Sequence, residues 1–321
     1  MFEQAVVLDE KKVSIAMCTY NGERFLAEQL DSILNQSYQN IEVVIVDDCS
    51  NDQTLSILHR YAEQDNRVRV FQNQQNLGFV KNFEKAIATC QSDYIALADQ
   101  DDVWFKDKIA VLMAEIGESL LIYSRVSLVD ENGNSLKEEF PGPSIKRIDG
   151  SCALSLIIAN CVTGHACLIR RELFEQARPA LANMPYHDQW LAIVAAAAGR
   201  MKASGSVLSY YRSHGKNVVF KGKVRKKRGE RKHVKAMRKL DAHLNFVSAV
   251  LCARVLTGTE ESVLREYLKL SSRSKKLFFN NALKVFLIEH QELFLASSSN
   301  IEKLVRKMCR GRWFFVFFPF T

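Results

Sequence analysis

The 321-residue sequence lacks the features of several classes of protein. With only 5 prolines, 14 glycines and no internal repeat, it is neither collagen-like nor a low-complexity disordered chain. None of its 8 cysteines lies in a C-x-x-C pair, so the sequence predicts neither a zinc site of ordinary spacing nor a disulfide framework. The first ten residues have no basic start and no long apolar core, and no signal peptide is expected.

Long hydrophobic runs are also missing. The longest uninterrupted run, Trp190 to Ala198, has nine residues, whereas a membrane-spanning helix needs roughly 18–20. The sequence therefore predicts no spanning helix. Several cysteines lie inside apolar segments, where a free thiol acts as a small hydrophobic side chain, and a cytoplasmic protein is expected.

Two glycine-rich motifs that cradle phosphates are absent. The sequence has no G-x-x-x-x-G-K-[ST] loop and no G-x-G-x-x-G turn, which argues against a P-loop ATPase and a dinucleotide-dependent dehydrogenase. A nucleotide bound without such a loop needs its phosphates neutralised in another way. A divalent metal held by carboxylates would do this.

The charge is distributed unevenly. The formal net charge is +8, but residues 1–220 carry 21 Lys and Arg against 28 Asp and Glu, a net of −7. Residues 221–321 carry 23 basic against 8 acidic residues, a net of +15. We therefore expect an acidic domain over residues 1–220 and a basic, helical C-terminal region over residues 221–321.

The first hundred residues alternate between short apolar strands and helices. Strands are predicted at residues 13–19, 41–46, 68–71 and 94–98, with helices at 23–35, 54–63 and 79–89. This order is typical of an α/β fold with a parallel sheet covered on both faces. Further along, the sequence predicts strands at 120–129 and 207–211 and a helix at 187–198. Ligands of such sheets bind beyond the carboxyl ends of the strands.

The segments after these strands are polar. Thr19–Glu23 follows the first strand, Asp47–Asp52 the second and Asp99–Asp102 the fourth. The last segment has two interpretations. It is either a solvated acidic turn, with Asp102 capping a helix that begins near Val103, or a site for Mg²⁺ or Mn²⁺.

Four segments carry a family resemblance. They are Ser14–Glu23, Val44–Thr54, Asn76–Phe79 and Ala98–Trp104, and in this order they resemble family 2 glycosyltransferases across residues 13–215. The resemblance implies the A-type glycosyltransferase fold, a Rossmann-like and mainly parallel sheet flanked by helices. It also implies a nucleotide-sugar donor, a Mg²⁺ or Mn²⁺ cofactor and inversion at the anomeric carbon.

The resemblance also implies roles for individual residues. Nucleotide-sugar contacts are expected from Thr19, Tyr20, Glu23, Asp48, Lys81, Asp99 and Arg212. The expected metal site consists of Asp101 as a direct ligand, Asp99 through ribose or metal-bound water, and His214 from a loop that closes over the donor. Arg212 is expected to meet the diphosphate.

An inverting transfer needs a base for the proton of the acceptor hydroxyl. Asp188 occupies the position that resembles the catalytic Asp of the family, at the start of a predicted helix. The alternative is that Asp188 only caps this helix. His187 stands where relatives usually have Glu, and its role is left open.

Three further residues are candidates for the acceptor site. His165 is either an acceptor contact or a buried structural histidine. Trp104 and Trp190 are either a platform for a sugar ring or core residues. The segments 98–104, 187–190 and 211–217 look similar to bacterial rhamnosyltransferases, which implies dTDP-L-rhamnose as donor and a glycan or lipid-linked acceptor of a surface polysaccharide.

The basic C-terminal region has competing interpretations. Its cationic run, residues 221–239, could contact nucleic acid or an anionic lipid surface. Six aromatic residues in the segment Trp313–Phe320 follow further cations and favour lipid over nucleic acid, unless they pack on the protein's own helices. We expect a peripheral enzyme on the cytoplasmic face of the inner membrane. The alternative is a non-catalytic nucleic-acid or membrane-binding adaptor on a degenerate nucleotide-sugar fold.

Overall fold

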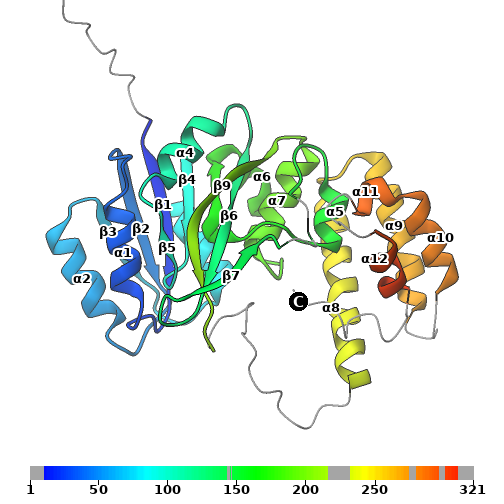
Figure 1. Cartoon of the computed structure of the whole chain (residues 1–321), viewed down its shortest axis with the longest axis horizontal. Coiled ribbons are helices and arrows are strands. Elements are labelled where there is room, and N and C mark those ends of the chain that lie inside the picture. The colour runs from blue at the N-terminus through cyan, green and yellow to red at the C-terminus, as the bar shows by residue number, and fades with distance from the viewer. Residues whose placement is uncertain are drawn as a thin grey trace, which may run out of the picture.

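A computed structural model describes residues 11–142, 145, 147–215, 232–274, 280–295 and 301–309 (Figure 1). The basic residues 221–231 and the aromatic segment 313–320 lie outside the described residues. The described residues form one mixed sheet of nine strands, ordered β3-β2-β1-β4-β8-β6-β9-β5, with β7 paired to β6.

The first half of the sheet is parallel, as the sequence predicts. It consists of β1 (Val13–Thr19), β2 (Ile41–Asp47), β3 (Val68–Gln72) and β4 (Tyr94–Ala98). Every residue of β2 and β4 is buried, because these strands are covered on both faces. The connecting helices are α1 (Leu26–Leu34), α2 (Thr54–Gln64) and α3 (Phe79–Thr89).

The second half mixes strand directions. Its strands are β5 (Val103–Trp104), β6 (Leu121–Val129), β7 (Ser135–Phe140), β8 (Cys167–Arg170) and β9 (Met201–Arg212). The strand β8 runs antiparallel to both β4 and β6, whereas β6 and β9 are parallel. Its helices are α4 (Lys108–Glu115), α5 (Ala153–Ile158), α6 (Arg171–Leu181) and α7 (His187–Ala197), with a 3₁₀ turn η1 (Gly164–Ala166).

The segment after Asp102 differs from the capping interpretation. Val103 and Trp104 form β5, which pairs antiparallel with Tyr210 and Ser209 of β9, and α4 begins only at Lys108. Asp102 therefore caps no helix. Its Oδ1 accepts a hydrogen bond from the backbone N–H of Arg212 at 3.0 Å, which ties the acidic turn to the end of β9.

The two faces of the sheet bury separate hydrophobic clusters. Ile15 and Met17 of β1 face one cluster with α1 and α4, whereas Ala16 faces the other with α3 and α7. This alternation is that of successive side chains along a strand. Packing of the two clusters on both faces holds the strands in place, and with them the starting points of the loops that follow the strands.

The C-terminal region is helical where the structure describes it. Its helices are α8 (Lys232–Ala253), α9 (Gly258–Arg273), α10 (Asn281–Glu289), α11 (Gln291–Leu295) and α12 (Ile301–Met308). They gather beyond α5, at the opposite end of the molecule from α2 (Figure 1). Their buried side chains belong to the same cluster as those of α5 and α7, and the Ser155 hydroxyl donates to the Leu293 carbonyl at 2.7 Å.

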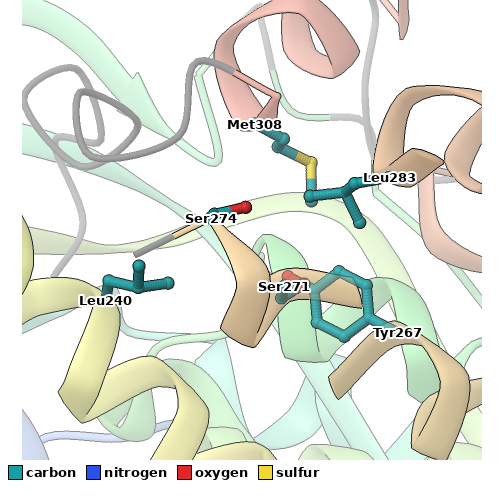
Figure 2. A pocket seen from close by; sticks show the side chains of 6 residues that line it. All are labelled: Leu240, Tyr267, Ser271, Ser274, Leu283 and Met308. Carbon is teal, nitrogen blue, oxygen red and sulfur yellow. The ribbon is translucent and has the colours of Figure 1, made fainter. Parts of the chain in front are cut away.

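A small cavity lies among these C-terminal helices. Its volume is about 10 Å³, which is room for about one water molecule. Figure 2 shows the side chains that line it: Leu240, Tyr267, Ser271, Ser274, Leu283 and Met308. This cavity is too small for a sugar, and it lies away from the strand ends. Among the described helices, none combines the length and apolar character that crossing a membrane requires.

Candidate active site

The loops after β1 and β2 are tied together at the edge of the sheet. Thr19 ends β1, is 2% exposed, and donates its hydroxyl to Asp47 Oδ1 at 2.9 Å. Asp47 Oδ2 in turn accepts from the backbone N–H of Ser50 at 2.8 Å. The Thr19 side chain thus fixes the loop, while the adjacent Tyr20 is 47% exposed and faces solvent.

Gln100 joins the first loop to the acidic turn. Its Oε1 accepts from the Tyr20 backbone N–H at 2.8 Å, and its Nε2 donates to the Tyr20 carbonyl at 3.1 Å. A Cβ atom added at Gly22 would lie 2.2 Å from Gln100 Oε1, so a side chain there would displace the Gln100 carboxamide. Gln100 was not among the predicted site residues. Its place between Asp99 and Asp101, the two carboxylates of an Asp-x-Asp motif, was the one indication in the sequence that it belongs to the site.

Glu23 and Asp48 hold neighbouring loops in the structure. Glu23 Oε2 accepts from the backbone N–H of Gln53 at 2.9 Å. Asp48 is 3% exposed and accepts from the backbone N–H groups of Leu77 at 2.8 Å and Gly78 at 2.9 Å. Asp48 therefore shapes the turn that leads into α3.

Lys81 follows Gly78 by three residues and lies exposed on the first turn of α3. Its position leaves the ammonium in solvent near the loop that Asp48 holds. Contact with a donor from this position stays a prediction.

The structure brings Asp101 and His214 together. Asp101 Oδ2 lies 2.8 Å from His214 Nε2, with the two side chains 17% and 9% exposed. The two residues come from the turn after β4 and the segment after β9, which are 113 positions apart in the sequence. A carboxylate oxygen and an imidazole nitrogen at this distance are placed as two ligands of one divalent ion would be.

Arg212 is buried between the acidic turn and α1. Its side chain is 4% exposed, and Nη2 lies 2.6 Å from Glu28 Oε2. Its Nε donates to the Asp101 carbonyl at 3.0 Å, and the guanidinium lies 4.8 Å from the centre of the Phe25 ring. Burial and these bonds hold Arg212 as a support for the acidic turn, and contact with a diphosphate would require it to leave them.

A second set of ligand atoms lies behind the acidic turn. One ligand atom each from Asp99, Asp102 and His165 falls within 4.8 Å of the others. His165 Nδ1 is 2.9 Å from Asp102 Oδ2 and 3.8 Å from Asp99 Oδ2. His165 is completely buried, whereas the Asp99 side chain is 37% exposed. The buried alternative for His165 is therefore the one that fits its position.

A buried lysine balances this acidic cluster. Lys108 is completely buried, donates its ammonium to the His165 carbonyl, and lies 4.0 Å from the centre of the Trp104 ring. A buried carboxylate is costly unless a counter-charge is close. Lys108 was not among the predicted site residues, because the sequence does not distinguish it from a surface lysine.

Burial shifts the proton affinities of the cluster. Burial, followed by the neighbouring Asp102 carboxylate, raises the pKa of Asp99 to about 8. Burial lowers the pKa of Lys108 to about 7 and that of His165 to about 3. These directions reflect the cost of holding a charge away from water. A divalent cation beside the turn would favour the ionised carboxylates.

The residues fit a divalent metal by their chemistry. Carboxylate oxygens suit Mg²⁺ and Mn²⁺, and Asp99, Asp101 and His214 bring oxygen and nitrogen atoms to one turn. Buried His165 Nε2 has no hydrogen-bond partner among the described residues. Asp102 and His165 are buried beside Lys108, whereas the side chains of Asp99 and Asp101 keep part of their surface exposed.

Asp188 lies in the first turn of α7. Its Oδ2 accepts from the backbone N–H of Gly164 at 3.1 Å, and its Oδ1 accepts from that of Gln189 at 2.7 Å. Burial raises the pKa of Asp188 to about 6, although these hydrogen bonds oppose the shift. The carboxylate is also close enough to Asp99 to contribute to the raised pKa of that residue. Asp188 and the acidic turn thus share one edge of the sheet.

The two tryptophans are core residues. Trp190 is completely buried and donates its indole N–H to the Ala177 carbonyl at 2.9 Å. Trp104 is 3% exposed and packs in the cluster of α1 and α4. The prediction of a sugar platform at these positions is wrong, because neither ring has a free face.

Comparisons with known proteins found a matching family and several relatives. Residues 14–178, a little over half of the chain, match the family described as Glycosyl transferase family 2. An uncharacterized glycosyltransferase of Haemophilus influenzae is 36% identical over 91 residues, 28% of each chain. The putative teichuronic acid biosynthesis glycosyltransferase TuaG of Bacillus subtilis is 33% identical over 185 residues, 57% of this chain and 71% of TuaG. The match to the Haemophilus influenzae protein covers much less than two thirds of that protein's length.

Solved structures share the fold. S. aureus TarS 1–349 in complex with UDP superposes with a TM-score of 0.58 at 19% identity, over 95% of this chain and 90% of that one. The mannosyltransferase PcManGT from Pyrobaculum calidifontis, in complex with GDP-Man and Mn²⁺, gives 0.54 at 21% identity, over 81% and 70%. The mixed sheet flanked by helices is therefore the predicted A-type glycosyltransferase fold.

Proposed function

The chain belongs to glycosyl transferase family 2, and from this premise we propose that it transfers a sugar from a nucleotide-sugar donor to a hydroxyl of a bacterial surface polysaccharide. One observation carries the proposal. The Asp101–His214 pair and the Asp188 carboxylate, with its raised pKa, lie at the same edge of the sheet. A metal site and a base are the two elements that an inverting transfer needs.

On the donor side, we propose that Asp101, Asp99 and His214 hold Mg²⁺ or Mn²⁺. Bound there, the metal would act as a Lewis acid on the diphosphate of the donor. Tyr20 is exposed, and its backbone is hydrogen-bonded to Gln100, which lies between Asp99 and Asp101. From this position we propose that Tyr20 contacts the nucleotide. Thr19, Glu23, Asp48 and Arg212 support the loops around it.

On the acceptor side, Asp188 accepts the proton of the attacking hydroxyl. A general base works best when its pKa lies near the operating pH, and burial raises that of Asp188 to about 6. The backbone N–H groups of Gly164 and Gln189 orient the carboxylate. Direct in-line attack by the acceptor then inverts the anomeric carbon.

For the donor, dTDP-L-rhamnose is the proposed substrate. The support is the likeness of segments 98–104, 187–190 and 211–217 to rhamnosyltransferases. TarS has been solved with UDP-GlcNAc and PcManGT with GDP-Man, so these two nucleotide-sugars are the informative competitors.

The donor is tested by thermal-shift screening with Mn²⁺. The panel contains dTDP-L-rhamnose, UDP-GlcNAc, UDP-glucose and GDP-mannose, each followed by chromatography for released nucleoside diphosphate. We expect the largest shift and the fastest release with dTDP-L-rhamnose, and both effects should vanish in EDTA. Release at full rate in EDTA would contradict the metal proposal. Shifts without any turnover, with or without added glycans, would favour the non-catalytic adaptor.

We further propose that the basic region, residues 221–321, holds the catalytic domain, residues 1–220, on an anionic membrane surface. Among the described residues, Val285 and Ile288 of α10 and Leu293 of α11 are 54%, 47% and 38% exposed. Exposed apolar side chains beside cations favour the surface of a lipid bilayer. A cytoplasmic enzyme with a lipid-linked acceptor would gain from this location.

Membrane binding is tested by flotation with liposomes containing anionic phosphatidylglycerol or only neutral phosphatidylcholine. Deleting residues 310–321 or introducing Val285→Ser with Ile288→Ser should release the protein from anionic liposomes. Deleting α9–α12 is unsuitable, because these helices share the hydrophobic cluster of α5 and α7. Unchanged flotation of both variants would contradict the anchor.

A further inference from the structure

Two aromatic rings, exposed Phe79 and half-buried Tyr186, lie near Asp188. Phe79 is the first residue of α3 and is 36% exposed. Tyr186 immediately precedes α7, and its ring centre lies 6.3 Å from that of Phe79, with the planes tilted by 34°. Burial, followed by the nearby Asp188 carboxylate, raises the pKa of Tyr186. The pair therefore lies next to the carboxylate that takes the acceptor proton.

The donor side of the site fixes the position of Phe79. Gly78 has a φ of +81°, a conformation that residues with a side chain rarely adopt. The Asp48 carboxylate accepts from the N–H groups of both Leu77 and Gly78, which holds this turn. The Phe79 ring is thus presented from a rigid loop, as a recognition surface requires.

His187 is buried next to Phe79. It is 6% exposed, stacks on Phe83 at 3.9 Å between ring centres, and meets Phe79 edge-on at 6.1 Å. Neither ring nitrogen has a hydrogen-bond partner among the described residues. Burial lowers the pKa of His187 to about 3, so the ring is neutral and offers one donor and one acceptor. A buried polar group without a partner is uncommon and points to a missing ligand group.

We propose that Phe79, Tyr186 and His187 form the acceptor subsite, which takes a pyranose ring whose apolar face lies on the two aromatic rings. This inference rests on the proposed function. A ring hydroxyl would supply a partner for His187, and the attacking hydroxyl would point at Asp188. Aromatic walls with a few convergent polar groups are typical of small-molecule sites.

The transfer forms one bond to the anomeric carbon and breaks another. The acceptor oxygen gives its proton to Asp188 and forms a bond to the anomeric carbon of the donor. The bond from that carbon to the diphosphate oxygen breaks, and the nucleoside diphosphate leaves with the electron pair. The subsite positions the acceptor oxygen on the face of the sugar opposite the departing diphosphate.

The test separates acceptor binding from donor chemistry. Saturation-transfer NMR with dTDP and diamagnetic Mg²⁺ present measures binding of p-nitrophenyl glycosides of glucose, galactose, N-acetylglucosamine and rhamnose. Hydrolysis of the preferred nucleotide-sugar without acceptor reports on the donor side. The variants are Phe79→Ala, Tyr186→Ala and His187→Phe, which keeps a ring against Phe83. Leu136→Ala, at a 41% exposed position on β7, is the matched control.

We expect each of the three variants to weaken glycoside binding by about 2- to 10-fold, a larger loss than in donor hydrolysis, whereas Leu136→Ala should change neither. A loss of donor hydrolysis as large as the loss of glycoside binding in Phe79→Ala and Tyr186→Ala would overturn the proposal, because these residues would then act on the whole site. So would unchanged glycoside binding in all variants, or a parent chain that hydrolyses donor but binds none of the glycosides. A parent chain that hydrolyses no nucleotide-sugar would instead overturn the proposed function.

Discussion

The acidic turn after β4 and the carboxylate of Asp188 share one edge of the sheet but are held in opposite ways. The turn is surrounded by the basic side chains of Arg212, Lys108 and His214. Asp188 receives hydrogen bonds from two backbone N–H groups, of Gly164 and Gln189. In the proposed function, the carboxylates of the acidic turn hold a cation, and the carboxylate of Asp188 accepts a proton.

The difference follows from the chemistry of each half. Clustered carboxylates need cations to stay ionised, and the proposed metal adds to those that the protein supplies. A base flanked by a cation would lose proton affinity, because the positive charge would lower its pKa. Neutral donors orient Asp188 and let burial raise its pKa to about 6.

The strongest test of this contrast is Asp188→Asn. We expect kcat to fall by about 10²- to 10⁴-fold, the usual contribution of general base catalysis, while the affinity for the nucleotide-sugar stays unchanged. The variant loses one of the two hydrogen bonds that Asp188 accepts but also removes the cost of a buried charge, so its melting temperature should change little. Steady-state kinetics, calorimetry and thermal melting measure these effects. Turnover at the parent rate would show that Asp188 only caps α7.

Lys108→Met tests whether the acidic turn needs its buried cation. Removing one partner of a buried charge set typically costs about 3–5 kcal/mol, and the loss should appear as a lower urea midpoint. Lys81→Met, at an exposed position on α3, is the control and should change stability little. Adding Asp102→Asn to Lys108→Met should restore part of the loss. Additive losses in the double variant would argue against coupling.

Asp101→Asn tests the metal side of the comparison. We expect Mn²⁺ to bind at least about 10-fold more weakly, since even groups that only support metal ligands contribute about this much. Asp107→Asn, an exposed carboxylate five residues past the Asp-x-Asp turn, should leave the affinity unchanged. Electron paramagnetic resonance titration with UDP present measures both. Equal Mn²⁺ affinity in the two variants would place the metal elsewhere.

The smallest effect concerns pH. Burial raises the pKa of Asp188 to about 6, and the base acts in its ionised form, so kcat should fall tenfold per pH unit below about 6. The sign for stability is opposite. A carboxyl whose pKa is raised by folding destabilises the folded state when ionised, so this residue favours folding more as the pH falls through 6. A kinetic limb near pH 4 would contradict the assigned environment of Asp188.

The sequence predicts the frame of the site better than its interior. Apolar strands followed by polar loops predict that the segments after β1, β2 and β4 meet, and they do. The coming together of Asp101 and His214 is not readable from spacing, because 113 positions separate them. Only the resemblance to a family suggested that pair.

Burial was the hardest property to predict. Lys108 looks like an ordinary surface lysine in the sequence, yet it is completely buried beside Asp102 and His165. Trp190 looks like a candidate platform, yet it lies in the core. The rings near Asp188 are those of exposed Phe79 and half-buried Tyr186, and Phe79 follows a turn fixed by Asp48, 31 residues earlier in the sequence. Such outcomes depend on tertiary packing that local patterns do not record.

The contact between Gly22 and Gln100 has an evolutionary consequence. A Cβ atom at position 22 would displace the carboxamide of Gln100, the glutamine that joins two loops of the site. A substitution at either position therefore changes which residues the other tolerates. Homologues with alanine or serine in place of Gly22 should carry a short side chain in place of Gln100, and the two positions should vary together among related sequences.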